Sequence, residues 1–142
     1  MTCSHPTPGE ALTDVTAAIL RSAAQIIADM NHVARGTMDD DDGYDVIGAV
    51  RVAAGLPAMP FNETKGQAYG PAAQLAHEAL CRLVRTFTPG FGNRYCDQPG
   101  PNSWGLPNVA TVEREAGRWS DAHGQEEIVD GLRFAANGGA PA

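Results

Sequence analysis

The chain has 142 residues, of which 43% are apolar, and 17 acidic against 10 basic residues give a formal net charge of −7. This length fits a single domain with one core, and the excess of acid argues against direct binding to nucleic acid phosphates. A start without basic or long apolar runs and three cysteines without framework spacing predict a soluble cytoplasmic protein with no secretory signal and no membrane span.

The first predicted helix starts near Thr7 and runs to about Arg35, with Gly36 as its stop. Thr7 can cap the helix, Pro8 suits its first position and Glu10 stands at the capping-box position. Apolar residues then recur every three or four positions, which places them on one helix face: Leu12, Val15, Ile19, Ala23, Ile26, Met30 and Val33. We expect this stripe to be buried inside the domain, and the alternative is the seam of a homodimer.

The rest of the chain predicts shorter helices. They are expected at 44–54, 71–87, 108–119 and 125–136. Prolines and glycines break the stretch 56–70 into turns. Because no segment alternates with period two, no sheet is expected. The sequence therefore predicts an all-α fold, a single domain over 1–142 with a bundle of four to five helices and disordered ends at 1–6 and 138–142.

The stretch 88–107 is predicted as a long loop. Eight of its 20 residues are proline or glycine, which excludes a regular helix or a central strand. Connections longer than about 12–15 residues are uncommon and are often functional. The predicted binding residues of this loop are Phe91, Arg94, Tyr95, Asp97 and Trp104. Its aromatic residues either anchor the loop on the bundle, which is the favoured interpretation, or line a pocket or partner surface.

Aromatic residues outside the loop receive a different interpretation. Phe87, Trp119 and Phe134 lie within predicted helices. We therefore expect them in the core, where aromatic side chains bury a large apolar area.

No metal site, cofactor or catalytic group is assigned. The acidic run from Asp39 to Asp45 fails the EF-hand spacing, and its acids are expected to favour the dipole of the second helix and to cap it. His77 and Cys81 lie four apart on one helix face and could bind zinc with Cys96, Asp97 or His123, but a buried structural Cys81 is the favoured alternative. A nucleophilic Cys96 lacks a nearby base. The sequence has no phosphate-binding glycine loop.

Two segments resemble a family of small proteins of unknown function from actinobacteria and their phages. The stretch from Tyr44 to Val50, with Ala53-Ala54-Gly55, is similar to that family's Trp-Cys-Ala-Leu-Gly-Ala motif and the Ala-Ala-Gly after it. Trp119-Ser120-Asp121 and the helix after it resemble the family's Trp-Asn-Asp segment and closing helix. Asp45 replaces a frequent Cys of the family, which counts against shared cysteine chemistry. The resemblance implies the helical fold and no activity.

Two functional hypotheses follow. Residues 1–45 contain eight acids and two arginines, and such an acidic region suits a basic protein partner. The first hypothesis is a non-enzymatic interaction or regulatory module that binds a protein. The alternative is a ligand-binding or catalytic protein whose pocket, between the bundle and the 88–107 loop, is built from Arg94, Tyr95, Trp104 and His77.

Overall fold

The computed structural model describes residues 15–59, 62, 64–68, 70–88, 91, 104 and 106–139. Six helices and no strand occur in these residues: α1 (Val15–Ala28), α2 (Val46–Ala53), α3 (Lys65–Ala68), α4 (Pro71–Phe87), α6 (Val109–Asp121) and α7 (Gln125–Ala136). The all-α class is thus confirmed. The helix count exceeds the expected four to five because α3 forms inside the stretch predicted as turns, where Thr64 and Gln67 build a reciprocal capping box.

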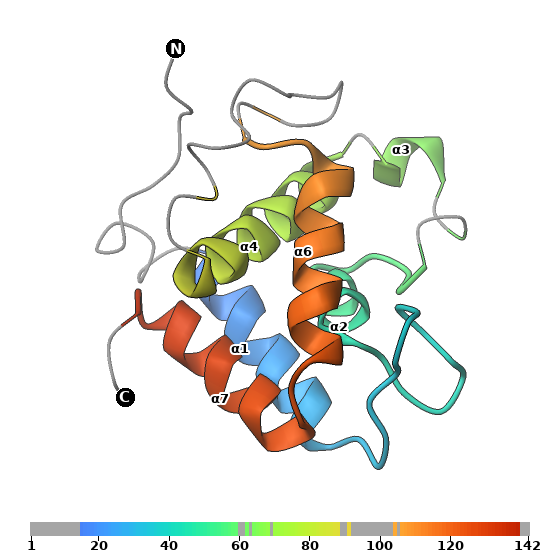
Figure 1. The fold of residues 1–142 in the computed structure, drawn as a ribbon. Coiled ribbons are helices and arrows are strands. Elements are labelled where there is room, and N and C mark those ends of the chain that lie inside the picture. Colours follow the sequence, from blue (N-terminus) through green and yellow to red (C-terminus); the bar gives the residue numbers. More distant parts are fainter. Residues whose placement is uncertain are drawn as a thin grey trace.

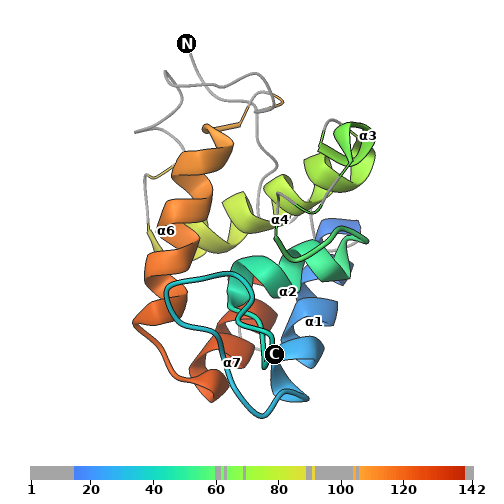
Figure 2. The ribbon, with the colours of Figure 1, turned by 90° about the vertical axis from the view of Figure 1, so that its right-hand side faces the viewer.

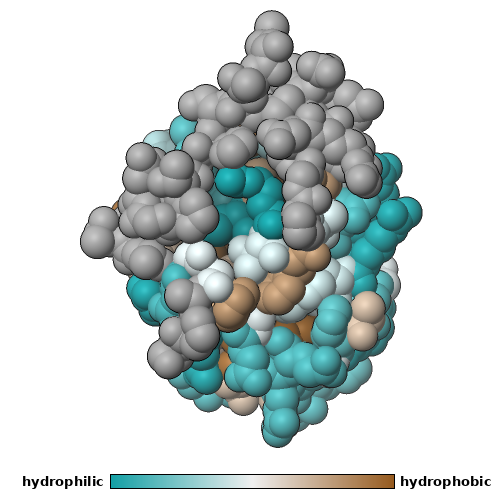
Figure 3. Space-filling view, turned by 60° about the vertical axis from the view of Figure 1, so that its left-hand side comes forward, coloured by the Kyte–Doolittle hydropathy of each residue, from teal (hydrophilic) through white to brown (hydrophobic). Residues whose placement is uncertain are grey.

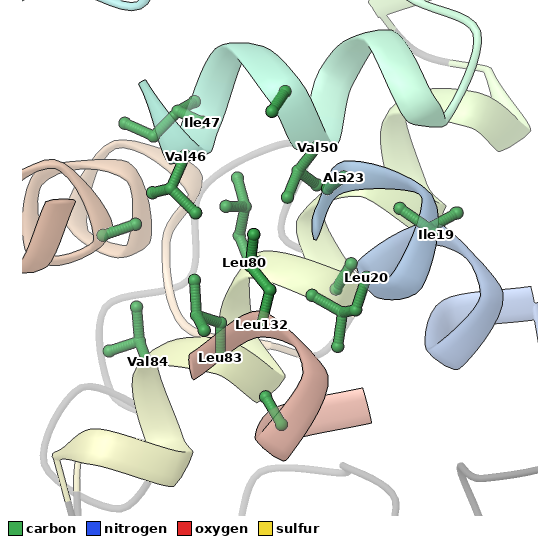
Figure 4. Packing of buried hydrophobic residues seen from close by; sticks show 14 of the residues in the cluster. Ile19, Leu20, Ala23, Val46, Ile47, Val50, Leu80, Leu83, Val84 and Leu132 are labelled. Atoms are coloured by element: carbon green, nitrogen blue, oxygen red, sulfur yellow. The ribbon is translucent and has the colours of Figure 1, made fainter. Parts of the chain in front are cut away.

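Helix α1 is the central element of the bundle. It packs against α7, α2 and α4, while α6 packs against α4 and α2 (Figure 1). Leu20 from α1, Leu80 from α4 and Leu132 from α7 meet in one buried cluster (Figure 4). Removal of this apolar surface from water is the main favourable contribution to folding, at about 25 cal/mol per Å².

The apolar stripe predicted for the first helix lies inside the domain. Ile19, Ala23 and Val33 are buried in the core, and Ile26 and Met30 are half-buried against it. Val15 is the exception, with 55% of its surface exposed. The stripe is therefore used for packing within one chain, as the sequence analysis favoured.

The predicted end of the first helix at Arg35 is wrong, because α1 ends at Ala28. The Gln125 side chain donates hydrogen bonds of 2.8 Å to the carbonyl oxygens of Ile27 and Met30. Further on, the Ala34 N–H donates to the Tyr44 carbonyl oxygen at 3.0 Å. These distant partners replace the next helical turn, and residues 29–45 instead pass beside the end of α6 and the start of α7 (Figure 2).

The other boundaries follow the sequence closely. Helices α4 and α7 have the predicted limits, and α6 extends two residues further than predicted. Gly55 after α2 and Gly138 after α7 have φ angles of 92° and 70°, the left-handed conformation that glycine adopts without steric cost. The end predicted as disordered from 138 begins with an ordered turn, since Gly139 N–H donates to the Phe134 carbonyl oxygen. Residues 1–14 and 140–142 lie outside the described residues.

Candidate functional site

The loop 88–107 supplied most of the predicted binding residues. Arg94, Tyr95 and Asp97, together with Cys96, lie outside the described residues. Phe91 is 1% exposed and belongs to the hydrophobic core, which is what the anchor interpretation expects of it. Trp104 is half-buried. Its φ of 49° is an uncommon, strained conformation for a bulky residue.

His77 brings α4 into contact with the end of this loop. Its ring centroid lies 5.9 Å from that of Trp104, and its Nε2 donates a hydrogen bond of 2.8 Å to the Pro107 carbonyl oxygen. Only 3% of His77 is exposed, and its Nδ1 has no hydrogen-bond partner. Burial lowers the pKa of His77 to about 4, although the Pro107 hydrogen bond opposes the shift. The imidazole is therefore neutral at pH 7, with one buried nitrogen unpaired.

Cys81, one turn further along α4, is a free and buried cysteine. Burial raises its pKa to about 11, against the opposing effect of Arg85. A protonated thiol is a poor nucleophile. Among the residues that the structure describes, no three His, Cys, Asp or Glu side chains are grouped to hold a metal ion. His123 is engaged elsewhere, with its Nδ1 donating to the Trp119 carbonyl oxygen at 2.7 Å.

Phe87, Trp119 and Phe134 form an aromatic strip across α4, α6 and α7. The ring centroids of Phe87 and Trp119 lie 5.0 Å apart and nearly stacked, and Phe134 lies 6.1 Å from Phe87. Their prediction as core residues is wrong for Phe87, which is 39% exposed, while Trp119 and Phe134 are half-buried. The side of the molecule on which α4 ends has apolar surface at the centre of the view, with hydrophilic residues around it (Figure 3).

Gly131 leaves room for the Trp119 ring beside α7. A Cβ at Gly131 would overlap the Trp119 ring and press on Phe87. The missing side chain therefore leaves the space that the indole occupies. The three aromatic residues lie in the last turns of α4, α6 and α7. Because these turns are at the edge of the bundle, the aromatic strip stays partly in contact with solvent.

A second polar arrangement joins the start of α2 to the end of α6, and we call it the α2–α6 junction (Asp45, Val46, Gly48, Ser120 and Asp121). Asp45 caps α2, its Oδ1 accepting from the Gly48 N–H at 2.9 Å. The Ser120 Oγ accepts from the Val46 N–H at 3.2 Å. Asp45 and Ser120 are 3% and 0% exposed. Sequence reasoning did not identify this arrangement, although both motifs of the family resemblance contribute to it.

The segment after α1 completes the junction. Arg35 donates to the Ser120 carbonyl oxygen, and the Gly36 N–H donates to Asp121 Oδ1 at 3.1 Å. Burial raises the pKa of Asp45 to about 7, with smaller contributions from the carboxylates of Asp121 and Glu113, against the hydrogen bonds from Gly48 and Ile47. The junction therefore acts as a structural connection with one buried carboxyl group that titrates near neutrality.

The acidic run from Asp39 to Asp45 caps α2 as predicted, through its last residue, Asp45. The earlier acids of the run close a turn of their own. Asp40 Oδ1 accepts from the Asp42 and Gly43 N–H groups, and Asp40 Oδ2 lies 2.5 Å from His32 Nε2. Side chains of Asx type commonly stabilise turns in this way.

An open groove of about 460 Å³ lies between the end of α1 and α7. It is lined by Ala28, Gln125, Glu126, Val129, Asp130 and Arg133. Its lining carries both signs of charge and only small apolar residues on its floor. This composition gives no indication of a ligand class.

None of the described helices is long and apolar enough to cross a membrane. The model of a family of unknown function, DUF6197, matches residues 12–138. Searches of curated proteins and of solved structures gave no match. The family match covers nearly the whole chain, is consistent with the expected family of unknown function, and brings no activity with it.

Proposed function

The chain belongs to this family of unknown function, and we propose that it is a non-enzymatic interaction module that binds a protein partner. The aromatic strip is the observation that carries the proposal. Phe87, at 39%, is one of two large apolar residues exposed on the described surface, and it extends the partly exposed rings of Trp119 and Phe134. Aromatic side chains with apolar bodies and partial exposure are enriched at the centres of protein interfaces.

The buried titratable groups support a role without catalysis. Asp45 caps a helix, His77 contacts Pro107, and Cys81 is a neutral thiol inside the core. No two of them are hydrogen-bonded to each other in the manner of a nucleophile and its base. Each has a structural role, which leaves surface recognition as the better-supported function.

The partner and its setting follow from the charge and the cysteines. A net charge of −7 favours a basic partner, and the three cysteines favour the reducing cytoplasm. The resemblance noted above implies an actinobacterial or phage source, in which a small regulatory factor of this kind would act on a host protein. The burial of the α1 stripe supports a different partner over a homodimer through α1.

Affinity capture with matched variants tests the proposal. The wild-type chain, Phe87→Ala and the control Val15→Ala serve as baits in a cytosolic extract of the source cell. Val15 is the other exposed large apolar residue and lies outside the strip. We expect a protein that is retained by wild type and by Val15→Ala and lost with Phe87→Ala. Equal retention by both variants, or no protein above background, would contradict the proposal.

A pocket for a small ligand beside the 88–107 loop is the second candidate. One observation favours it: His77 Nδ1 is buried and unpaired next to Trp104, and a ligand with a hydrogen-bond donor could pair with it. The binding roles of Arg94, Tyr95 and Asp97 stay predictions. A thermal-shift screen with metabolites and divalent metals tests this candidate, and a melting temperature that no compound raises would count against it.

A further inference from the structure

The contact between α4 and the end of the long loop depends on the protonation state of one ring. His77 Nε2 faces the Pro107 carbonyl oxygen at 2.8 Å. A carbonyl oxygen only accepts hydrogen bonds, so Nε2 carries the proton and the neutral ring leaves Nδ1 as an acceptor. This assignment fixes the tautomer of His77 from its one hydrogen bond.

A second proton on this ring would be unfavourable. It would have to bind Nδ1, which is buried and has no hydrogen-bond partner, in a side chain that is 3% exposed. The added N–H would have no hydrogen-bond acceptor, and the positive charge would be shielded from water. Both effects cost free energy. The buried position of His77 beside Trp104 and Pro107 therefore opposes protonation, whereas a solvent-exposed His77 could be protonated.

The segment on the other side of the contact consists of Trp104, Leu106 and Pro107, and we call it the Trp104 segment. Leu106 and Pro107 are buried against the bundle, and Trp104 keeps a φ of 49°. For a bulky residue this conformation is strained and persists only where surrounding contacts hold it. The hydrogen bond and ring contact from His77 are two of these contacts.

We propose that His77 is a proton-sensitive latch: the neutral ring holds Trp104 and the Pro107 carbonyl group on α4, and protonation of the ring breaks both contacts and exposes Trp104 while Leu106 and the helical bundle stay packed. The device goes beyond the proposed partner binding and does not depend on it. It would couple acidification to the exposure of the Trp104 side chain.

The direction of the effect follows from linkage. The held ring has a pKa of about 4, lowered from 6.5 by burial, whereas a released ring regains its ordinary value. Above pH 6.5 the contact has its full strength. From there down to pH 4 the equilibrium constant for holding Trp104 falls by about tenfold per pH unit. Among the described residues no carboxylate or cationic group contributes to this pKa, and Cys81 on the same helix is a neutral thiol.

Acrylamide quenching of Trp104 fluorescence tests the proposal. The Trp119→Phe variant leaves Trp104 as the sole tryptophan, and far-UV circular dichroism of the same samples reports the helices. We expect the quenching constant of Trp104 to rise several-fold between about pH 6.5 and 4 while the helical signal stays constant. Loss of both signals together, or a quenching constant that stays flat until the helices unfold, would overturn the latch.

The His77→Gln substitution in the same background is the matched variant. Glutamine keeps an N–H donor for the Pro107 carbonyl oxygen and does not titrate. We expect its Trp104 quenching to stay constant over the pH range in which the parent changes. An identical rise in the variant would assign the release to another group and overturn the proposal. His77→Phe provides a second non-titrating ring if the glutamine variant does not fold.

Discussion

Asp45 and His77 are both buried titratable groups, one at the cap of α2 and the other in the contact between α4 and Pro107, and burial shifts their pKa values in opposite directions. The pKa of Asp45 rises to about 7, and that of His77 falls to about 4. Loss of water disfavours the charged form of each, which is the anion for the acid and the cation for the base. At the α2–α6 junction Asp45 and Ser120 accept backbone hydrogen bonds, whereas His77 leaves Nδ1 unpaired.

The opposite shifts have compensating effects on stability. Between about pH 4 and 6.5 the folded chain holds the Asp45 proton that the unfolded chain has lost, so stability falls as the pH rises. Over the same range the unfolded chain holds a His77 proton that the folded chain with its latch closed lacks, so the stability of this closed form rises with pH. Each slope is about 1.4 kcal/mol per pH unit, and the two cancel. We expect these two groups together to leave the free energy of unfolding nearly constant there.

Asp45→Asn breaks this balance and has the largest expected effect. Asparagine keeps the oxygen that caps α2 and removes the titration. Above pH 7 wild type carries a buried carboxylate that the variant lacks. We compare the free energies of unfolding of the variant and wild type at each pH. Between pH 4 and pH 8 this difference should shift in favour of the variant by on the order of 4 kcal/mol. Urea unfolding across this pH range measures the effect.

His77→Gln is the reciprocal control for the same measurement. With the His77 titration removed, stability should fall as the pH rises from about 4 to 7, because the Asp45 contribution is then uncompensated. Profiles of the two variants that run parallel to wild type would show that neither group titrates as its burial implies.

Gly48→Ala tests how closely the α2–α6 junction is packed, and its expected effect is the second largest. A Cβ at Gly48 would overlap the Met38 carbonyl oxygen and crowd Tyr44. Because the obstacle is backbone, the segment before α2 must move, at a cost of about 3 kcal/mol. Chemical denaturation gives the change in the free energy of unfolding.

Gly117→Ala is the matched control on a neighbouring helix. Its Cβ would make ordinary contact with the Ile47 side chain at 3.5 Å, and alanine has the higher helix propensity by about 1 kcal/mol. We expect a neutral or stabilising effect. Equal destabilisation by both substitutions would show that the junction has no special packing.

Local patterns predicted most of the fold. The spacing of apolar residues in α4 and α7, with Pro71 at the start and Asn137 at the end, indicates those helices without tertiary information. The end of α1 could not be predicted in this way. Gln125 replaces its last turn from 98 positions away along the chain, and single-sequence periodicity contains no record of such a partner.

The candidate sites were less predictable than the helices. Val46 and Ser120 are 74 positions apart, so no spacing rule connects them, and only the resemblance stated from the sequence included both segments. Phe87 was misassigned to the core because periodicity places it on the apolar face of α4 without showing that this face reaches the end of the bundle. His77 was identified as a zinc candidate and as a pocket residue together with Trp104. Its hydrogen bond with Pro107 was missed, because that contact depends on the return of the chain after the loop.

Ser120→Ala has the smallest expected effect and sharpens the contrast between the paired junction and the unpaired ring. Removal of the hydroxyl leaves the Val46 N–H without its acceptor in a site where Ser120 is 0% exposed. A buried, unsatisfied donor costs about 1–3 kcal/mol, so we expect a loss near 2 kcal/mol in the free energy of unfolding. The exposed Ser22 of α1 gives the control Ser22→Ala, which should change stability by less than about 0.5 kcal/mol. If both substitutions are neutral, the hydroxyl of Ser120 does not stabilise the start of α2, and the paired junction tolerates an unpaired group as readily as His77 does.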